Sequence, residues 1–181
     1  MKSYLITDPT FYSSNPKIFL NRLLHKVETT SPDFICIRDK ITNNYKAIAV
    51  EVKKNIRQKK VFLHTDYMLA YELGFYGVHL PSNNFENIEK AKALGLKVII
   101  STHTLKEAKK AEKLGADFIT YSPIFDTPNK GTPKGLENLK EINGKININC
   151  FALGGIINEE QILACKKTGV YGFASIRYFI K

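Results

Sequence analysis

Cysteine is scarce in this chain, and long apolar runs are absent. The three cysteines (Cys36, Cys150 and Cys165) are an odd number without CxxC spacing, which excludes a disulfide framework and indicates reduced thiols. No segment approaches the ~20 apolar residues that a membrane-spanning helix needs, so no membrane partner is expected. The first residues, MKSYLITDP, lack the apolar stretch and cleavage site of a signal peptide. We therefore expect a cytoplasmic protein.

Acidic residues are few relative to basic ones. There are 27 Lys and Arg against 17 Asp and Glu, which gives a formal net charge of +10. Such a surplus suits nucleic acid, a membrane surface or small polyanions. The lysine doublets, however, fall in separate predicted helices, with no basic arm and no aromatic-interleaved stripe. We interpret this charge as solvated helix faces and expect no nucleic-acid partner.

Strand-like and helix-like segments alternate along the chain. This alternation predicts a parallel sheet, and eight units fit a closed (β/α)8 TIM barrel. A doubly wound open sheet is the alternative, although the GxGxxG fingerprint of a dinucleotide-binding domain is absent. Only residues 178–181 follow the last strand and Arg177, so the barrel is expected to be compact, with its last helix short or missing. A single domain, residues 1–181, is predicted, with strands at Tyr4–Thr7, Phe34–Ile37, Val61–Leu63, Gly77–Leu80, Val98–Ser101, Phe118–Tyr121, Asn149–Leu153 and Gly172–Ile176.

One polar loop follows the predicted strand Phe118–Tyr121. Residues 121–135 read YSPIFDTPNKGTPKG, with prolines and glycines that fix the path of the backbone. Thr127, Asn129 and Lys130 supply the hydroxyl, amide and ammonium groups that an anion such as phosphate needs. Because the active site of a TIM barrel lies at the C-terminal ends of its strands, this loop is a candidate phosphate-binding segment.

Charged or flexible positions follow two other strands. Arg38 and Lys40 are two apart on an extended segment and so point the same way. Together they would grip a pyrophosphate, the arginine by its fork and the lysine as a point charge. The alternative is an ion pair with Asp39. Gly154 and Gly155 offer backbone N–H groups ahead of a helix, which suits a phosphate but equally an ordinary tight turn.

The remaining strand ends leave two interpretations open. Asp66 would ligate Mg²⁺ or cap the helix that follows it. Ser101 and Thr102 would bind an anion or cap their helix, and capping is preferred. His79, on an apolar strand, and His103, at a helix start, have no HxH or HxxxH partner, so each is expected to be structural rather than a metal ligand.

Sequence motifs follow one another along the chain: YLITDP, FICIRDK, HTDYMLAYELGFYGVHL, STHTLKEAKKAEKLGADFITYSPIFDTPNK, ALGGI and GVYGFASI. Through these motifs, nearly the whole chain resembles the thiamine phosphate synthase family, which includes the related thiazole tautomerases. The resemblance implies a (β/α)8 barrel and a transferase of thiamine biosynthesis. The family's reaction joins hydroxymethylpyrimidine diphosphate to a thiazole phosphate and releases pyrophosphate, which implies small phosphate-bearing substrates.

The resemblance also implies roles for individual positions. Arg38, Lys40, Ser101 and Lys130 would hold the pyrophosphate. Mg²⁺ would bind Asp66, with Asn84 at the second metal position. The other substrate-binding positions would be Thr127, Asn129, Gly155, Ile176 and Arg177.

Several positions depart from the family pattern. Loss of one of two metal carboxylates, at Asn84, is expected to weaken Mg²⁺ binding. Pro123 stands where the tautomerases carry a histidine, so the sequence is closer to the synthases in this loop. The other departures are Cys36 for glutamine, Thr65 for asparagine, Asn129 for threonine and Arg177 for serine.

Three functions stay open from the sequence. The first is a Mg²⁺-dependent synthase. The second is a relative that acts on thiazole phosphate alone, such as an isomerase, with His79 or His103 as the base. The third is a phosphate-ligand binder without catalysis. A homo-oligomer, in which a partner subunit completes the short C-terminus, is also left open.

Overall fold

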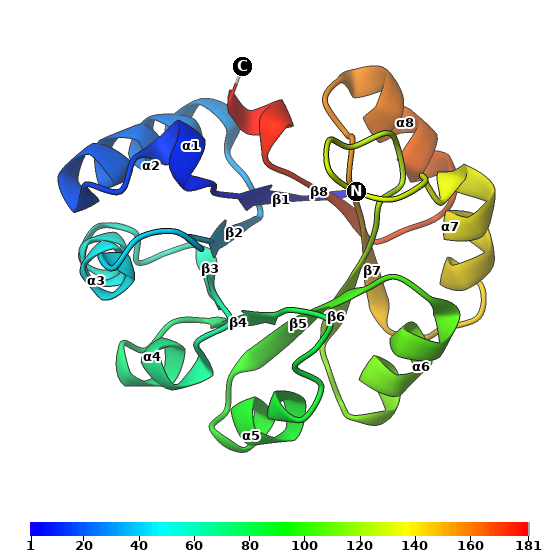
Figure 1. The fold of residues 1–181 in the computed structure, drawn as a ribbon, viewed down its shortest axis with the longest axis horizontal. Coiled ribbons are helices and arrows are strands. Elements are labelled where there is room, and N and C mark those ends of the chain that lie inside the picture. The colour runs from blue at the N-terminus through cyan, green and yellow to red at the C-terminus, as the bar shows by residue number, and fades with distance from the viewer. Residues whose placement is uncertain (181) are drawn as a thin grey trace.

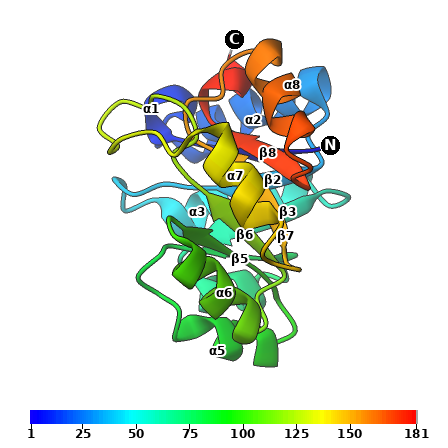
Figure 2. The same ribbon diagram turned by 90° about the vertical axis from the view of Figure 1, so that its right-hand side faces the viewer.

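A computed structural model of the chain describes residues 1–180. Eight parallel strands form a closed barrel in sequence order, with β8 (Gly172–Ser175) paired to β1 (Lys2–Ile6) (Figure 1). The helices surround the strands as an outer layer (Figure 2). The closure of the sheet confirms the predicted (β/α)8 barrel and excludes the open-sheet alternative.

Strands and helices alternate through the described residues. The other strands are β2 (Phe34–Ile37), β3 (Lys60–His64), β4 (Gly77–Leu80), β5 (Lys97–Thr102), β6 (Phe118–Tyr121) and β7 (Asn149–Leu153). The helices are α1 (Pro9–Tyr12), α2 (Pro16–Thr30), α3 (Tyr45–Asn55), α4 (Tyr67–Glu72), α5 (Asn87–Ala93), α6 (Leu105–Lys113), α7 (Gly135–Asn143) and α8 (Glu159–Lys167). Every predicted strand is present, with ends that differ by at most two residues. After β8 stands a short 3-10 helix, η1 (Arg177–Ile180), which confirms the expected short last helix.

Aromatic rings fill the inside of the barrel. Phe34 packs edge-on against Phe118 and Phe151, with ring centroids 5.4 and 5.3 Å away. Gly172 makes room for this layer, since a Cβ there would lie 2.5 Å from a ring carbon of Phe151. Because these rings pack together inside the barrel, the C-terminal ends of the strands are the place to look for a ligand site. The inner cluster comprises Tyr4, Ile6, Phe34, Cys36, Phe62, Ile99, Phe118, Phe151 and Ala174.

Polar residues cap the helices just beyond the strand ends. The side chains of Asp8, Asp66, Thr104 and Asn158 accept hydrogen bonds from backbone N–H groups of α1, α4, α6 and α8. Several residues at the rim of the barrel therefore serve the fold, whatever else they do. Within residues 1–180, none of the helices has both the length and the apolar character needed to cross a bilayer.

Candidate active site

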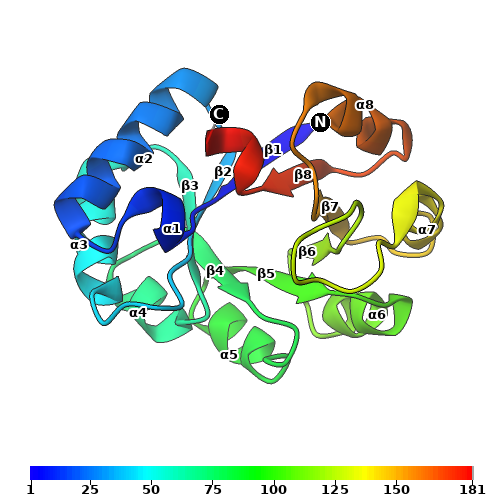
Figure 3. The same ribbon diagram turned by 45° about the horizontal axis from the view of Figure 1, so that its top comes forward.

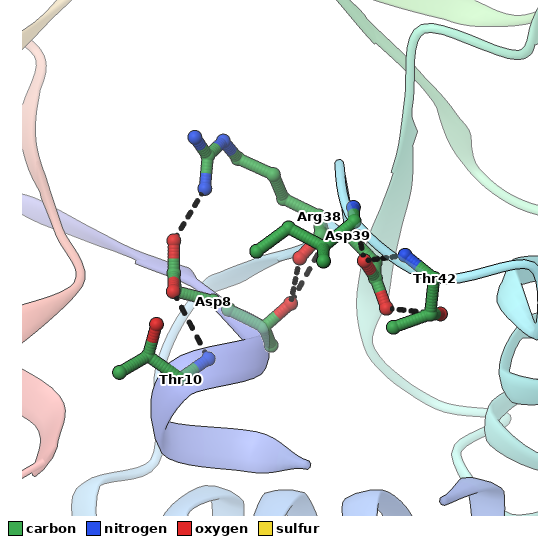
Figure 4. Close-up of polar contacts among 7 residues, drawn as sticks. Asp8, Thr10, Arg38, Asp39 and Thr42 are labelled. Carbon is green, nitrogen blue, oxygen red and sulfur yellow. Dashed lines mark hydrogen bonds and ion pairs between the residues drawn. The ribbon is translucent and has the colours of Figure 1, made fainter. Parts of the chain in front are cut away.

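Arg38 lies one residue beyond β2 and pairs with Asp8, at the end of β1. Arg38 Nη1 donates to Asp8 Oδ2 at 2.7 Å, and the two side chains are 25% and 22% exposed (Figure 4). Thr7 fixes the backbone of Arg38, whose N–H donates to Thr7 Oγ1 at 2.8 Å. Burial opposes ionisation of Asp8, but hydrogen bonds from Thr10 and Arg38 lower its pKa on balance. The guanidinium is thus held in one orientation at the rim.

Asp39 turns away from Arg38, so the alternative of an ion pair within the Arg-Asp-Lys run is wrong (Figure 4). Its carboxylate accepts instead from the backbone N–H groups of Ile41 and Thr42, at 2.8 and 3.0 Å, and from the Thr42 hydroxyl at 2.7 Å. Local turn formation wins over the ion pair because these donors lie within three residues of the carboxylate. Asp39 shapes the loop after β2 and leaves Lys40 free to face the mouth.

A cluster of positive charge lies at the mouth of the barrel. Burial lowers the pKa of Lys40, and the neighbouring charges of Arg38 and Lys130 lower it further. Lys130 reaches this cluster from the loop after β6, whereas the other two follow β2. Like charges disfavour one another. A di- or polyanion bound between them would relieve this repulsion, which makes the cluster a candidate pyrophosphate site.

The loop after β6 is fixed against the end of β7 (Figure 3). The N–H groups of Ile124 and Phe125 donate to the carbonyls of Leu153 and Gly154, each at 3.0 Å. Within the loop, Thr127 Oγ1 donates to Phe125 O at 2.9 Å. The structure therefore brings this loop and the Gly154–Gly155 turn together, as their joint assignment to one phosphate site requires.

Gly155 sits where no other residue fits easily. Its φ is +70°, and a Cβ would lie 2.5 Å from the carbonyl oxygen of Asp126. Among the described residues, its N–H forms no hydrogen bond. Ser175 ties this turn to β8: its hydroxyl donates to Ile156 O at 2.7 Å and accepts from the N–H of Tyr178 at 3.1 Å. The turn after β7 and the start of η1 thereby form the place where TIM barrels often bind phosphate.

The other substrate-binding candidates border this phosphate site. Ile176 and Arg177 join β8 to η1, and Ile176 packs on the inner cluster. Asn129 is exposed at the tip of the loop after β6, in the left-handed conformation with φ +60°. Its amide is therefore solvated in the absence of a ligand.

A buried hydrogen-bonded chain runs under the mouth. Tyr4 Oη lies 2.9 Å from His79 Nδ1, and His79 Nε2 lies 3.1 Å from Ser101 Oγ. Burial, and then the charges of His64, Arg38 and Lys40, hold the pKa of His79 well below its usual range. His79 is thus neutral and satisfied at both nitrogens, as predicted for a structural histidine.

The expected capping by Ser101 and Thr102 is wrong. Thr104 caps α6 instead, because its hydroxyl accepts from Glu107 N–H at 3.2 Å. Thr102 Oγ1 donates to Thr120 O at 3.0 Å. Ser101 therefore points into the barrel, which leaves it to the anion-binding alternative. His103 is held by Ser122 O, 3.0 Å from its Nδ1, which agrees with the structural role predicted for it.

The metal candidates provide few ligands. Asp66 Oδ1 accepts from Leu69 N–H at 2.9 Å, so this carboxylate caps α4 and has its other oxygen left for a metal. Asn84 lies in the loop after β4, where its N–H donates to Pro81 O at 3.0 Å. Within residues 1–180, no three His, Cys, Asp or Glu side chains are grouped to hold a metal. Because Mg²⁺ is bound through one or two carboxylates together with substrate phosphates and water, Asp66 fits a Mg²⁺ that arrives with its substrate.

Sequence reasoning missed three residues of this site as contributors. Tyr4 reads as a core aromatic, and Ser175 as a strand residue, because their partners lie far away in sequence. Asp8 directly follows the predicted strand Tyr4–Thr7, and this position at a strand end could have identified it as a residue of the rim. A groove of about 510 Å³ between α7 and α8 contains none of the candidate residues.

Comparison with known proteins identifies relatives over almost the whole chain. The family model for thiamine monophosphate synthase matches residues 3–179. The chain is similar to a putative thiamine-phosphate synthase 2 of Aquifex aeolicus, with 39% identity over 98% of this chain and 97% of the relative. It is similar to a thiamine-phosphate synthase of Clostridium novyi, with 33% identity over 99% and 91% of the two chains. A solved thiamine phosphate pyrophosphorylase from Pyrococcus furiosus matches with TM-score 0.82 and 29% identity, over 97% of this chain and 85% of that one. The resemblance seen in the motifs is confirmed, and the chain belongs to the thiamine monophosphate synthase family.

Proposed function

We propose that this chain condenses hydroxymethylpyrimidine diphosphate with a thiazole phosphate and releases pyrophosphate. The observation that carries the proposal is the convergence of Arg38, Lys40 and Lys130 from two separate loops, with the mutual effect of their charges. A second phosphate place, around Gly155 and Thr127, lies beside the same loop. One mouth with two phosphate places suits two phosphate-bearing substrates.

The chain's own groups account for the steps of this transfer. As the carbon–oxygen bond breaks, its electron pair leaves with the pyrophosphate, and the three cations neutralise the charge that develops there. The thiazole nitrogen then donates its electron pair to the pyrimidine cation, and the thiazole phosphate holds that nitrogen in position. Mg²⁺, when bound at Asp66, would supply further positive charge to the diphosphate.

Ser101 is the candidate hydrogen-bond donor to the pyrophosphate. Burial keeps the pKa of Tyr4 well above its usual range, so its hydroxyl stays protonated. We assign this hydroxyl as the donor to His79 Nδ1, which places the imidazole proton on Nε2 and directs it to Ser101 Oγ. The Ser101 O–H is then left for a substrate oxygen. The same bonds occupy both nitrogens of His79, which leaves none for the proton abstraction that the isomerase alternative requires of it.

An assay with purified protein, both substrates and Mg²⁺ tests the proposal. We expect thiamine phosphate and pyrophosphate to form, and Arg38→Ala to lower turnover strongly, because the substitution removes a fixed charge from the leaving group. Arg57→Ala is the matched control, since Arg57 is exposed two residues beyond α3. Absence of product, with diphosphate binding retained, would favour the non-catalytic binder. Equal activity of Arg38→Ala and wild type would refute the site assignment. The buried, reduced thiols fit the cytoplasmic setting of such an enzyme.

A further inference from the structure

Four neighbouring strands each place one polar side chain inside the barrel near its mouth. These are His64 on β3, His79 on β4, Ser101 on β5 and Thr120 on β6, here called the polar arc. Strand pairing sets His64 beside His79 and Ser101 beside Thr120. The opposite strands contribute apolar side chains at their C-terminal ends, so the floor of the mouth is half polar and half apolar. Those apolar residues are Ile6, Cys36, Leu153 and Ile176.

Two members of the polar arc have unused hydrogen-bonding atoms. The Thr120 hydroxyl is fully buried and, among residues 1–180, has no partner. The His64 ring is bonded at Nδ1, 2.9 Å from Thr65 Oγ1, whereas its Nε2 has no partner in the same part of the chain. Unlike the Thr120 hydroxyl, His64 Nε2 is not enclosed by protein atoms, so it is accessible from the mouth. An accessible nitrogen without a protein partner is available to hydrogen-bond a ligand.

Hydrogen bonds fix the backbone of His64 and the direction of its ring. Tyr45 Oη accepts from its N–H at 2.7 Å and donates to Ile37 O at 2.8 Å. Thr65 has φ +71°, a strained value for a β-branched residue, and its N–H donates to His79 O at 2.9 Å. Such strain gathers at functional sites. Here it directs the Thr65 hydroxyl to Nδ1, which leaves Nε2 to face the mouth.

We propose that His64 is a specificity-determining residue whose Nε2 hydrogen-bonds the uncharged nitrogen heteroaromatic ring of the diphosphate substrate. The inference rests on the proposed function, which supplies a ring joined to a diphosphate. Arg38 and Lys40 lie at the rim just after β2, where their charges suit the phosphates and repel a cationic ring. The apolar half of the floor packs against the ring face.

Binding of two ligands to the full chain separates this role from a structural one. Inorganic pyrophosphate tests the cation cluster alone, and hydroxymethylpyrimidine diphosphate tests the cluster and the floor together. His64→Gln keeps an amide near the place of Nε2, whereas His64→Asn keeps one near Nδ1 and loses the outer contact. We expect His64→Asn to weaken binding of the pyrimidine diphosphate about tenfold or more, because a buried ring atom is left unpaired. His64→Gln should restore most of that affinity, and pyrophosphate should bind all forms alike.

The inference would be overturned if His64→Gln bound the pyrimidine diphosphate more weakly than His64→Asn. If His64 acts only through Thr65, His64→Asn binds as wild type and His64→Gln is impaired. Equal losses for both ligands would also overturn it. Thr120→Val serves as a second variant that conserves shape: because the Thr120 hydroxyl is enclosed, binding of the ring-bearing ligand should be unchanged, and a loss equal to that of His64→Asn would overturn the assignment to His64. If wild type forms product and His64→Asn binds the pyrimidine diphosphate as wild type does, this inference is wrong and the synthase function is retained. If His64→Asn weakens binding of the ring-bearing ligand alone but wild type forms no product, the synthase function is wrong and this inference is retained.

Discussion

Replacing Lys40 by glutamine should stabilise the free protein while it weakens anion binding. The pKa of Lys40 is lowered by burial and by Arg38 and Lys130, so its charged form is disfavoured in the folded state. Lys40 is largely solvated, which limits the gain from neutralising it to about 0.5 kcal/mol. For a chain of this size, that corresponds to a rise of about 1–2 °C in Tm. The gain should be fully present at neutral pH and disappear as pH rises past about 10.4, where Lys40 is neutral in both states.

The same substitution removes one charged donor from the candidate pyrophosphate site. A hydrogen bond to a charged group contributes about 1.5–3 kcal/mol, and the lower end applies at an exposed lysine, so affinity for pyrophosphate should fall about tenfold. Calorimetry gives the dissociation constant, and thermal unfolding with and without pyrophosphate gives the stability. Added salt should shrink both effects, because it screens exposed charges.

Lys109→Gln is the matched control for this pair of measurements. Lys109 is exposed on α6, outside the mouth, so neither Tm nor pyrophosphate affinity should move. Opposite signs for stability and binding in Lys40→Gln are the distinctive result. A lower Tm, or a dissociation constant within twofold of wild type, would refute the reasoning that these cations are gathered for an anion.

Two further changes test the interior. Tyr12→Phe should raise stability by about 1 kcal/mol and Tm by about 2–4 °C, because the Tyr12 hydroxyl is buried and unpartnered among residues 1–180; a lower Tm would contradict this. His79 has a pKa well below its usual range, so below about pH 6.5 the unfolded chain binds a proton that the folded chain does not. His79 should therefore contribute a fall in stability with falling pH of up to about 1.4 kcal/mol per unit, beside a similar contribution from His64, so the slope should be less steep in His79→Gln; equal slopes in urea unfolding between pH 7 and 5 would count against it.

The barrel could be predicted because its signals are local. Each strand is a short apolar run with polar residues after it, and both faces of every strand are covered. The observed strand ends differ from the predicted ones by a residue or two, as at Lys2 and His64. Pairing with a neighbouring strand extends each strand beyond its apolar residues. Closure between β8 and β1 was predicted from the count of units rather than from any residue.

The site could be predicted only as a set of positions. Strand ends located Arg38, Lys40 and the loop after β6, since all parallel strands end at one rim. The partners were not predictable, because they depend on which strands are neighbours and on how far a side chain reaches. Arg38 pairs with Asp8 and not with the adjacent Asp39, and Ser101 hydrogen-bonds His79 and does not cap α6. Local alternatives existed in both cases, and tertiary contacts decided between them.

The charge pattern of the mouth mirrors a ligand with two unlike ends. Cations stand at the rim, where Asp8 offsets only part of their charge. Just below, burial and then the charges of Lys40 and Arg38 lower the pKa of His64 to about 3, so the polar arc stays neutral at physiological pH. A substrate that is polyanionic at one end and uncharged but polar at the other satisfies both layers at once. A simple polyanion satisfies only the rim, and a neutral metabolite only the floor. The two layers together therefore argue for a diphosphate carried on a neutral ring more strongly than either layer does alone.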